Sequence, residues 1–152
     1  VAGDLPGLDQ PALALAPQAG KGIEDGLLKL EDILKLSMDA DLVVLSACNT
    51  AAADGNGAEA VSGLGRGFFY AGARAVLATH WPVETVSARE LVTHLFQRYA
   101  RDGKLTRAQA LRQAMLELID KGVALDGRGK PEHSYAHPAF WAPYALYGDP
   151  GR

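Results

Sequence analysis

The stretch DLVVLSACNT, residues 41–50, decides the fold that we expect for this chain of 152 residues. From Leu42 to Leu45 it is a short apolar run rich in β-branched residues, which is typical of a fully buried strand in a parallel sheet. Small residues follow, and among them is Cys48, the only cysteine of the chain. Catalytic groups of open α/β sheets gather beyond the carboxyl ends of the strands, so Cys48 is a candidate reactive thiol. Because free cysteines are often buried, Cys48 as a small core side chain stays an alternative.

Other apolar runs predict further strands around this one. Residues 73–79 form the second clear parallel strand, and the right-handed crossover rule makes it the expected neighbour of the 42–47 strand. Residues 144–147 are predicted to be the last strand, and residues 12–16, bracketed by two prolines, a short one.

Between these predicted strands, the apolar residues are spaced as they are in helices. Residues 30–36 predict one or two helical turns, and residues 58–71 and 85–101 carry apolar side chains three and four positions apart. Thr106 and Gln109 form a capping box ahead of another helix that ends at Gly122, whereas residues 123–136 are expected to be a surface loop. The alternation predicts an α/β fold with helices packed on a mainly parallel sheet.

Composition excludes several classes of protein. Apolar residues make up 48% and charged residues 22%, which is ordinary for a globular domain. The net charge is −3 with no basic block, so nucleic acid is not an expected partner. No apolar stretch approaches the roughly 20 residues of a membrane span. A single cysteine forms no intrachain disulfide and fits a reducing compartment, which favours the cytoplasm.

Three blocks of the sequence resemble the CHAT family, which belongs to the caspase-like cysteine peptidases together with caspases and separases. They are LVVLSACNTAAADG, EAVSGLGRGFFYAGARAVLATHWPVE and HPAFWAPYALYGD, and the resemblance runs from about Leu5 to Asp149. It implies a caspase-like three-layer fold with a mainly parallel sheet and helices on both faces. Residues 1–152 would then be a single CHAT peptidase domain that lacks its N-terminal part.

The resemblance also implies a catalytic assignment. The family's nucleophile is the cysteine of the LSAC motif, which corresponds to Cys48. Its general base is a histidine in a His-Gly motif that follows the preceding core strand. That motif is expected immediately upstream of Val1, so the 152-residue chain alone is expected to be inactive.

His80 is the histidine for which the two lines of reasoning differ. It follows the 73–79 strand, and from the residues alone Cys48 and His80 would form the catalytic dyad. The resemblance instead places the His80-Trp81 segment in the substrate pocket, and we adopt that interpretation. His94 and His133 are expected on the surface, and His137 is expected to have a structural role.

The remaining candidate site residues flank Cys48 and His80. Trp81 and Pro82 resemble the segment that binds an extended substrate by backbone pairing, although a tryptophan is also often a core side chain. Asn49 is expected in the substrate site, and Glu59 matches an acidic position of the family that braces the loop after the cysteine. No spacing of His, Cys, Asp and Glu indicates a metal site, and no phosphate-binding loop is present, so no cofactor is expected.

These observations predict a cysteine endopeptidase that cleaves protein or peptide substrates. The alternative is a non-catalytic CHAT scaffold or protein-interaction module, and a third possibility is an unrelated α/β domain with Cys48 in its core. The expected partner besides substrate is the N-terminal part of the same protein, which in this family usually contains helical repeats.

Overall fold

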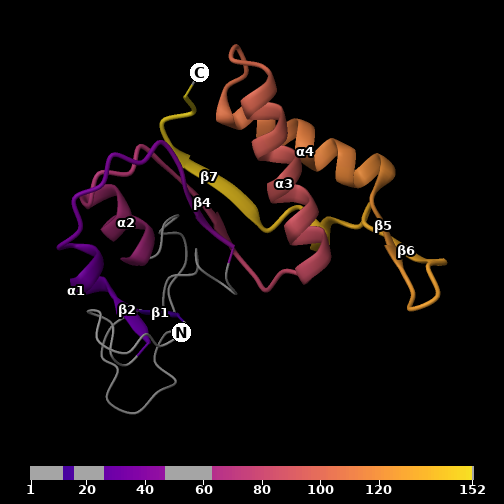
Figure 1. Cartoon of the computed structure of the whole chain (residues 1–152), viewed down its shortest axis with the longest axis horizontal. Coiled ribbons are helices and arrows are strands. Elements are labelled where there is room, and N and C mark those ends of the chain that lie inside the picture. The colour runs from indigo at the N-terminus through magenta and orange to yellow at the C-terminus, as the bar shows by residue number, and fades with distance from the viewer. Residues whose placement is uncertain (1–11, 16–25, 47–62, 152) are drawn as a thin grey trace.

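The computed structural model describes residues 12–15, 26–46 and 63–151 of the chain. They form a mixed α/β structure with a three-stranded sheet and two small two-stranded sheets (Figure 1). The larger sheet contains β3 (Val43–Leu45), β4 (Ala75–Thr79) and β7 (Tyr144–Gly148), in the order β3-β4-β7. The predicted strands over 73–79 and 144–147 are therefore confirmed.

β4, rather than β3, is the central and fully buried strand of this sheet. All five residues of β4 are buried, whereas Val43 and Val44 of β3 are only half-buried. β3 pairs with β4 in parallel, with Leu45 opposite Ala78, so the two predicted strands are neighbours as expected. The prediction that the 42–45 run is fully buried is wrong for the described residues, because β3 lies at the edge of the three strands.

The expected mainly parallel sheet is also wrong for the described residues. β7 pairs with β4 antiparallel, and both smaller sheets are antiparallel. The cause is the connection from β4 to β7, which contains two helices, α3 (Thr85–Arg101) and α4 (Arg107–Lys121). α3 carries the chain away from the carboxyl end of β4 and α4 brings it back. After a hairpin and a 3₁₀ helix, β7 starts at that end of β4 and therefore runs antiparallel to it.

Helices cover both faces of β4. On one face Val76 and Ala78 pack with α1 (Leu30–Ile33) and α2 (Gly63–Tyr70), whose contributors to this core include Ile33 and Phe68. On the other face Leu77 packs with leucines of α3 and α4. This alternation is the period of two along a strand, and it gives the domain two cores that share one sheet.

The helix ends follow from local sequence. The side chain of Glu84 caps α3 by accepting hydrogen bonds from the backbone N–H groups of Val86 and Ser87. Thr106 and Gln109 form the predicted capping box at the start of α4, and Gly122 follows its last residue. The predicted helix over 85–101 is confirmed with the same bounds.

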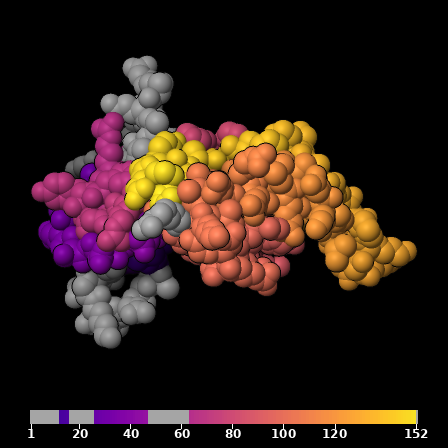
Figure 2. Space-filling model, turned by 90° about the horizontal axis from the view of Figure 1, so that it is seen from above, coloured from indigo at the N-terminus to yellow at the C-terminus, as the bar shows by residue number. Residues whose placement is uncertain are grey.

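Two antiparallel hairpins complete the structure. β1 (Ala12–Ala14) pairs with β2 (Leu27–Lys29), and the first of these was expected as a short strand. β5 (Val123–Leu125) and β6 (Pro131–Ser134) lie in the region that we predicted to be a loop. The hairpin projects from the body of the domain (Figure 2), and every residue of β6 is exposed. β6 therefore lacks the alternating burial that makes a strand visible in a sequence, and β5 is only three residues long.

Candidate functional site

The carboxyl ends of β3 and β4 meet at one edge of the sheet. Because Leu45 pairs with Ala78 in parallel, the chain leaves both strands on the same side. Ser46 follows β3 and is exposed, and His80 follows β4 and is also exposed. This is the edge at which the sequence predicted a site.

His80 is held at this edge by its backbone and by its side chain. Its backbone N–H donates to the carbonyl oxygen of Pro143 over 3.0 Å. Its Nε2 atom lies 2.9 Å from the hydroxyl oxygen of Tyr147, and the two rings meet edge to face with centroids 6.3 Å apart. Burial raises the pKa of Tyr147, so its hydroxyl is protonated at neutral pH.

The register of β4 and β7 explains how Tyr147 reaches His80. Val76 lies opposite Tyr147, and Ala78 lies opposite Ala145. These side chains share a face with His80, which is the next position of that face along the chain. The intervening pair on these two strands is Ala78 and Ala145, whose side chains are short, so the phenol can extend along the sheet to the imidazole.

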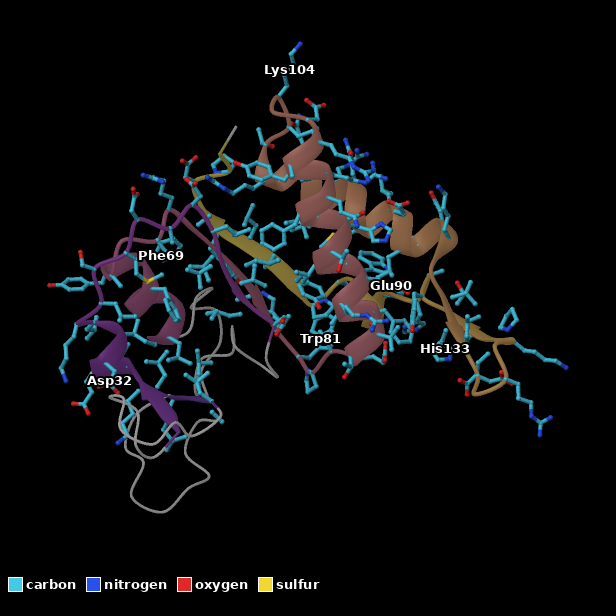
Figure 3. All side chains as sticks on the ribbon, in the orientation of Figure 1. Asp32, Phe69, Trp81, Glu90, Lys104 and His133 are labelled. Atoms are coloured by element: carbon cyan, nitrogen blue, oxygen red, sulfur yellow. The ribbon has the colours of Figure 1, made fainter. Side chains whose placement is uncertain are left out.

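Trp81 interacts with a different element from His80. Its indole Nε1–H donates to the carbonyl oxygen of Ala139 over 3.3 Å, in the 3₁₀ helix η1 (Pro138–Phe140). Figure 3 shows Trp81 in the turn between β4 and α3. The residue is 40% exposed, so it is not a core side chain. His80 contacts β7 and Trp81 contacts η1, and the two side chains do not share partners within the described residues.

The backbone after His80 is unpaired in the described part of the chain. Residues 81–83 make no backbone–backbone hydrogen bond there, and Trp81 and Pro82 are exposed. The next residue, Glu84, caps α3. Burial opposes ionisation of Glu84, but the hydrogen bonds from the backbone of Ser87 and Val86 outweigh it and lower its pKa. The segment thus runs between two fixed points, β4 and the start of α3.

Tyr144 is a feature of this edge that the sequence analysis missed. It lies opposite Thr79, the last residue of β4, and is only 5% exposed. Its hydroxyl is buried and has no hydrogen-bond partner among the described residues. Burial raises the pKa of Tyr144 to about 12. In sequence it is only an aromatic residue at the start of a strand, which gives no signal of an unpartnered hydroxyl.

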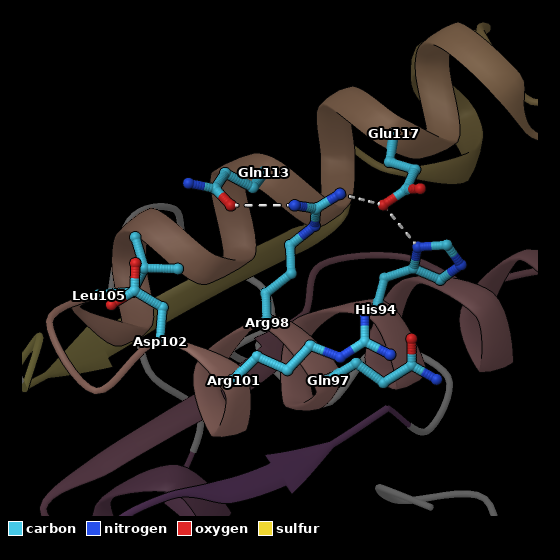
Figure 4. Close-up of a pocket in the computed structure, with 8 residues that line it drawn as sticks. All are labelled: His94, Gln97, Arg98, Arg101, Asp102, Leu105, Gln113 and Glu117. Atoms are coloured by element: carbon cyan, nitrogen blue, oxygen red, sulfur yellow. Dashed lines mark hydrogen bonds and ion pairs between the residues drawn. The ribbon is translucent and has the colours of Figure 1, made fainter.

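His94 was expected to be a solvated surface residue, but its side chain is only 34% exposed and is paired with another helix. Its Nδ1 atom lies 2.8 Å from Oε2 of Glu117, and the same oxygen accepts a hydrogen bond from Arg98. Arg98 also donates to Oε1 of Gln113 over 3.2 Å. These residues lie at a cavity of about 270 Å³ between α3 and α4 (Figure 4), which is separate from the edge that carries His80.

The other two histidines occupy structural positions. Nδ1 of His137 accepts a hydrogen bond from the backbone N–H of Ala139 over 3.2 Å and so caps η1, which confirms its predicted role. His133 is exposed on β6, as expected, and stacks on Phe140 with ring centroids 5.5 Å apart.

Three of the predicted site residues, Cys48, Asn49 and Glu59, lie outside the described residues. The predicted site is therefore described only on its β4 side, by His80, Trp81 and Pro82. Within the described ranges no cluster of His, Cys, Asp and Glu is arranged to bind a metal ion. In the same ranges no helix has the length and apolar character needed to cross a bilayer.

Comparison with known proteins identifies the family. The CHAT domain matches residues 4–149 of the chain. Human "Tetratricopeptide repeat protein 28" is 31% identical over 126 residues, which are 83% of this chain and 4% of that protein. The chain thus spans a small fraction of the curated relative that it matches. No solved structure matches it significantly. Because the match covers nearly the whole chain and includes every strand and helix described above, this protein belongs to the CHAT domain family.

Proposed function

We propose that this CHAT domain is the catalytic part of a cysteine endopeptidase with Cys48 as its nucleophile. The observation that carries the proposal is the common edge of β3 and β4, where Ser46 and His80 are both exposed. Cys48 comes two residues after Ser46, and an extended chain spans only about 3.3–3.6 Å per residue. We propose that the thiol lies at this edge, at which α/β enzymes bind their substrates.

The chemistry requires a base beside Cys48. An ordinary thiol titrates near pH 8.5 and needs an adjacent imidazole to form the thiolate at neutral pH. The thiolate would attack the scissile carbonyl carbon, and the amine would leave with the proton held by the imidazole. Water would then hydrolyse the thioester. Backbone N–H groups near Cys48 would stabilise the oxyanion.

We further propose that this base is the histidine of a His-Gly motif upstream of Val1. β3 has β4 as its one strand neighbour among the described residues, and its other edge faces away from β4. A preceding strand on that edge would bring its own carboxyl end beside Cys48. With that strand the sheet would gain a second parallel pair, as in the caspase-like three-layer fold, and residues 1–152 would be the later part of one domain.

The substrate would bind along residues 81–83. Their unpaired backbone suits the addition of an extended peptide as a further strand, in which main-chain hydrogen bonds supply much of the affinity. His80, Trp81 and Pro82 would line this side of the substrate, and Asn49 and Glu59 would belong to the Cys48 side. The lone cysteine favours a reducing compartment, and we expect the protein in the cytoplasm.

The decisive experiment compares the 152-residue chain with a form extended upstream through the His-Gly motif. Both are incubated with a proteome-derived peptide library, and cleavage is read by mass spectrometry. We expect cleavage by the extended form alone, its loss in Cys48→Ala, and an effect of His80→Ala mainly on KM. Cleavage by the 152-residue chain that is lost on His80→Ala would make Cys48 and His80 the dyad instead.

A non-catalytic interaction module is the second candidate. The observation that favours it is the relative named for tetratricopeptide repeats, of which this chain spans 4%. We infer that the N-terminal part of this protein also contains helical repeats, with which the CHAT domain would pack. An extended form that contains the His-Gly motif, is folded and cleaves nothing would favour this function.

A further inference from the structure

We propose that Tyr147 is a positioning residue that holds His80 in the Nδ1–H tautomer and so presents that N–H to a carbonyl oxygen of the peptide substrate. The inference deepens the proposed endopeptidase function, on which its substrate part rests. It concerns a pair of side chains that lie far apart in the sequence and meet across β4 and β7.

The first step is the direction of the hydrogen bond between the two side chains. The hydroxyl oxygen of Tyr147 and Nε2 of His80 are 2.9 Å apart, a distance at which one of them donates. If Nε2–H donated, the phenol proton would need another acceptor, and none is present among the described residues. An imidazole nitrogen is also a stronger acceptor than a phenol oxygen, and a phenol O–H is a stronger donor than a neutral imidazole N–H. The phenol therefore donates to Nε2.

The second step follows from the proton count of imidazole. A neutral imidazole has one N–H, and the hydrogen bond at one nitrogen sets which nitrogen carries it. With Nε2 as acceptor, the proton of His80 is on Nδ1. His80 is exposed, and within the described ranges Nδ1 has no hydrogen-bond partner. The side chain thus offers a neutral donor at the carboxyl edge of the sheet.

The third step concerns what this donor can bind. The unpaired backbone of residues 81–83 begins directly after His80, and the backbone N–H of His80 is fixed by Pro143. A peptide along residues 81–83 would carry carbonyl oxygens past this edge, and an amide carbonyl is the natural acceptor for a neutral N–H. In this tautomer the only ring lone pair accepts from Tyr147. His80 then has no free lone pair to take a proton from Cys48.

Nitrogen-15 NMR of the histidine side chains tests the tautomer without any substrate. The spectra are recorded on the 152-residue chain near pH 8, above the usual imidazole pKa of about 6.5. The His80 signals are assigned by their loss in His80→Gln. We expect a protonated Nδ1 and an unprotonated Nε2 in the parent, and a shift toward Nε2–H in Tyr147→Phe. A parent His80 that is mainly Nε2–H, or a tautomer unchanged by Tyr147→Phe, would overturn the proposal.

Kinetics of the extended peptidase test the role in substrate binding. The probe is the peptide of the library that the parent cleaves fastest. Tyr147→Phe should raise KM roughly two- to tenfold, the factor expected for one weakened hydrogen bond, and leave kcat nearly unchanged. Tyr70→Phe is the matched control, since Tyr70 is 79% exposed on α2. An unchanged KM in Tyr147→Phe would overturn the assignment. If the extended protein cleaves no peptide, the proposed function fails, and the NMR comparison still decides the tautomer.

Discussion

Nδ1 of His94 lies 2.8 Å from Oε2 of Glu117, and this contact joins the middle of α3 to the last part of α4. The same oxygen accepts from Arg98, and the other carboxylate oxygen lies 3.9 Å from Nζ of Lys121. Glu117 is only 22% exposed. One carboxylate thus links the two helices that cover a face of the sheet.

This cluster predicts how stability responds to acid. The hydrogen bonds from Arg98 and His94 lower the pKa of Glu117 from its ordinary 4.5 to about 2. Since the folded pKa is depressed, the stabilising contribution is fully present above pH 4.5 and is lost as the pH falls toward 2. We expect Glu117→Gln to reduce the free energy of unfolding at pH 7 by about 1–2 kcal/mol, measured by urea unfolding.

The difference between Glu117→Gln and the parent should narrow as the pH is lowered through this window. Glu132→Gln is the control, because Glu132 is exposed on β6. If the difference in the free energy of unfolding between Glu117→Gln and the parent stayed constant from pH 7 to about pH 2, the carboxylate charge would not stabilise the helix pair.

The Glu117 cluster shows which features of the structure can be predicted from the sequence and which cannot. The periodicity of α3 is a local property, and it gave the bounds of that helix correctly. His94 was expected on the surface, and that expectation considered only its own helix. Its actual partner is on another helix, 23 positions later, and no pattern within one helix reveals such a contact.

At the candidate site, too, the local features were predicted from the sequence and the contact between distant elements was not. The apolar run of β4 was enough to put His80 and Trp81 at the end of a strand next to β3. The contact of His80 with Tyr147 depends on the antiparallel register of β7. The antiparallel direction of β7 follows from the long connection between β4 and β7, whereas mainly parallel strands were expected from the sequence.

Gly72 is predicted to be indispensable for the turn between α2 and β4. Its φ angle is +108°, and an added Cβ atom would lie 2.2 Å from the carbonyl oxygen of Met38. Gly72→Ala therefore combines backbone strain with a clash against main chain, and we expect a loss of at least about 2 kcal/mol in the free energy of unfolding. Gly103→Ala is the control, because nothing lies within 4 Å of its added Cβ. Equal stability of the two variants would contradict the prediction.

Loss of the hydroxyl group should change the stability of the domain in opposite directions at Tyr144 and Tyr135. The buried Tyr144 hydroxyl has no partner among the described residues, so Tyr144→Phe should stabilise the domain by about 1 kcal/mol. Tyr135 is equally buried, but its hydroxyl shares a hydrogen bond with Glu84. Tyr135→Phe should destabilise by a similar amount. Thermal unfolding of the two variants provides the measurement, and a loss of stability in Tyr144→Phe would show that its hydroxyl is paired in solution.

The last prediction concerns the reactivity of Cys48, and it separates the three functions considered from the sequence. Since Cys48 is the only cysteine, alkylation with iodoacetamide reports on one thiol. In the 152-residue chain we expect an accessible thiol whose rate follows an unassisted titration near pH 8.5. In the form extended through the His-Gly motif, the adjacent imidazole should keep the rate high at neutral pH. Cys48→Ala should leave the unfolding temperature nearly unchanged in both forms. A thiol that reacts only after unfolding would place Cys48 in the core and remove the nucleophile. A thiol that is accessible but equally slow in both forms would favour the interaction module, because a nearby base would then be absent.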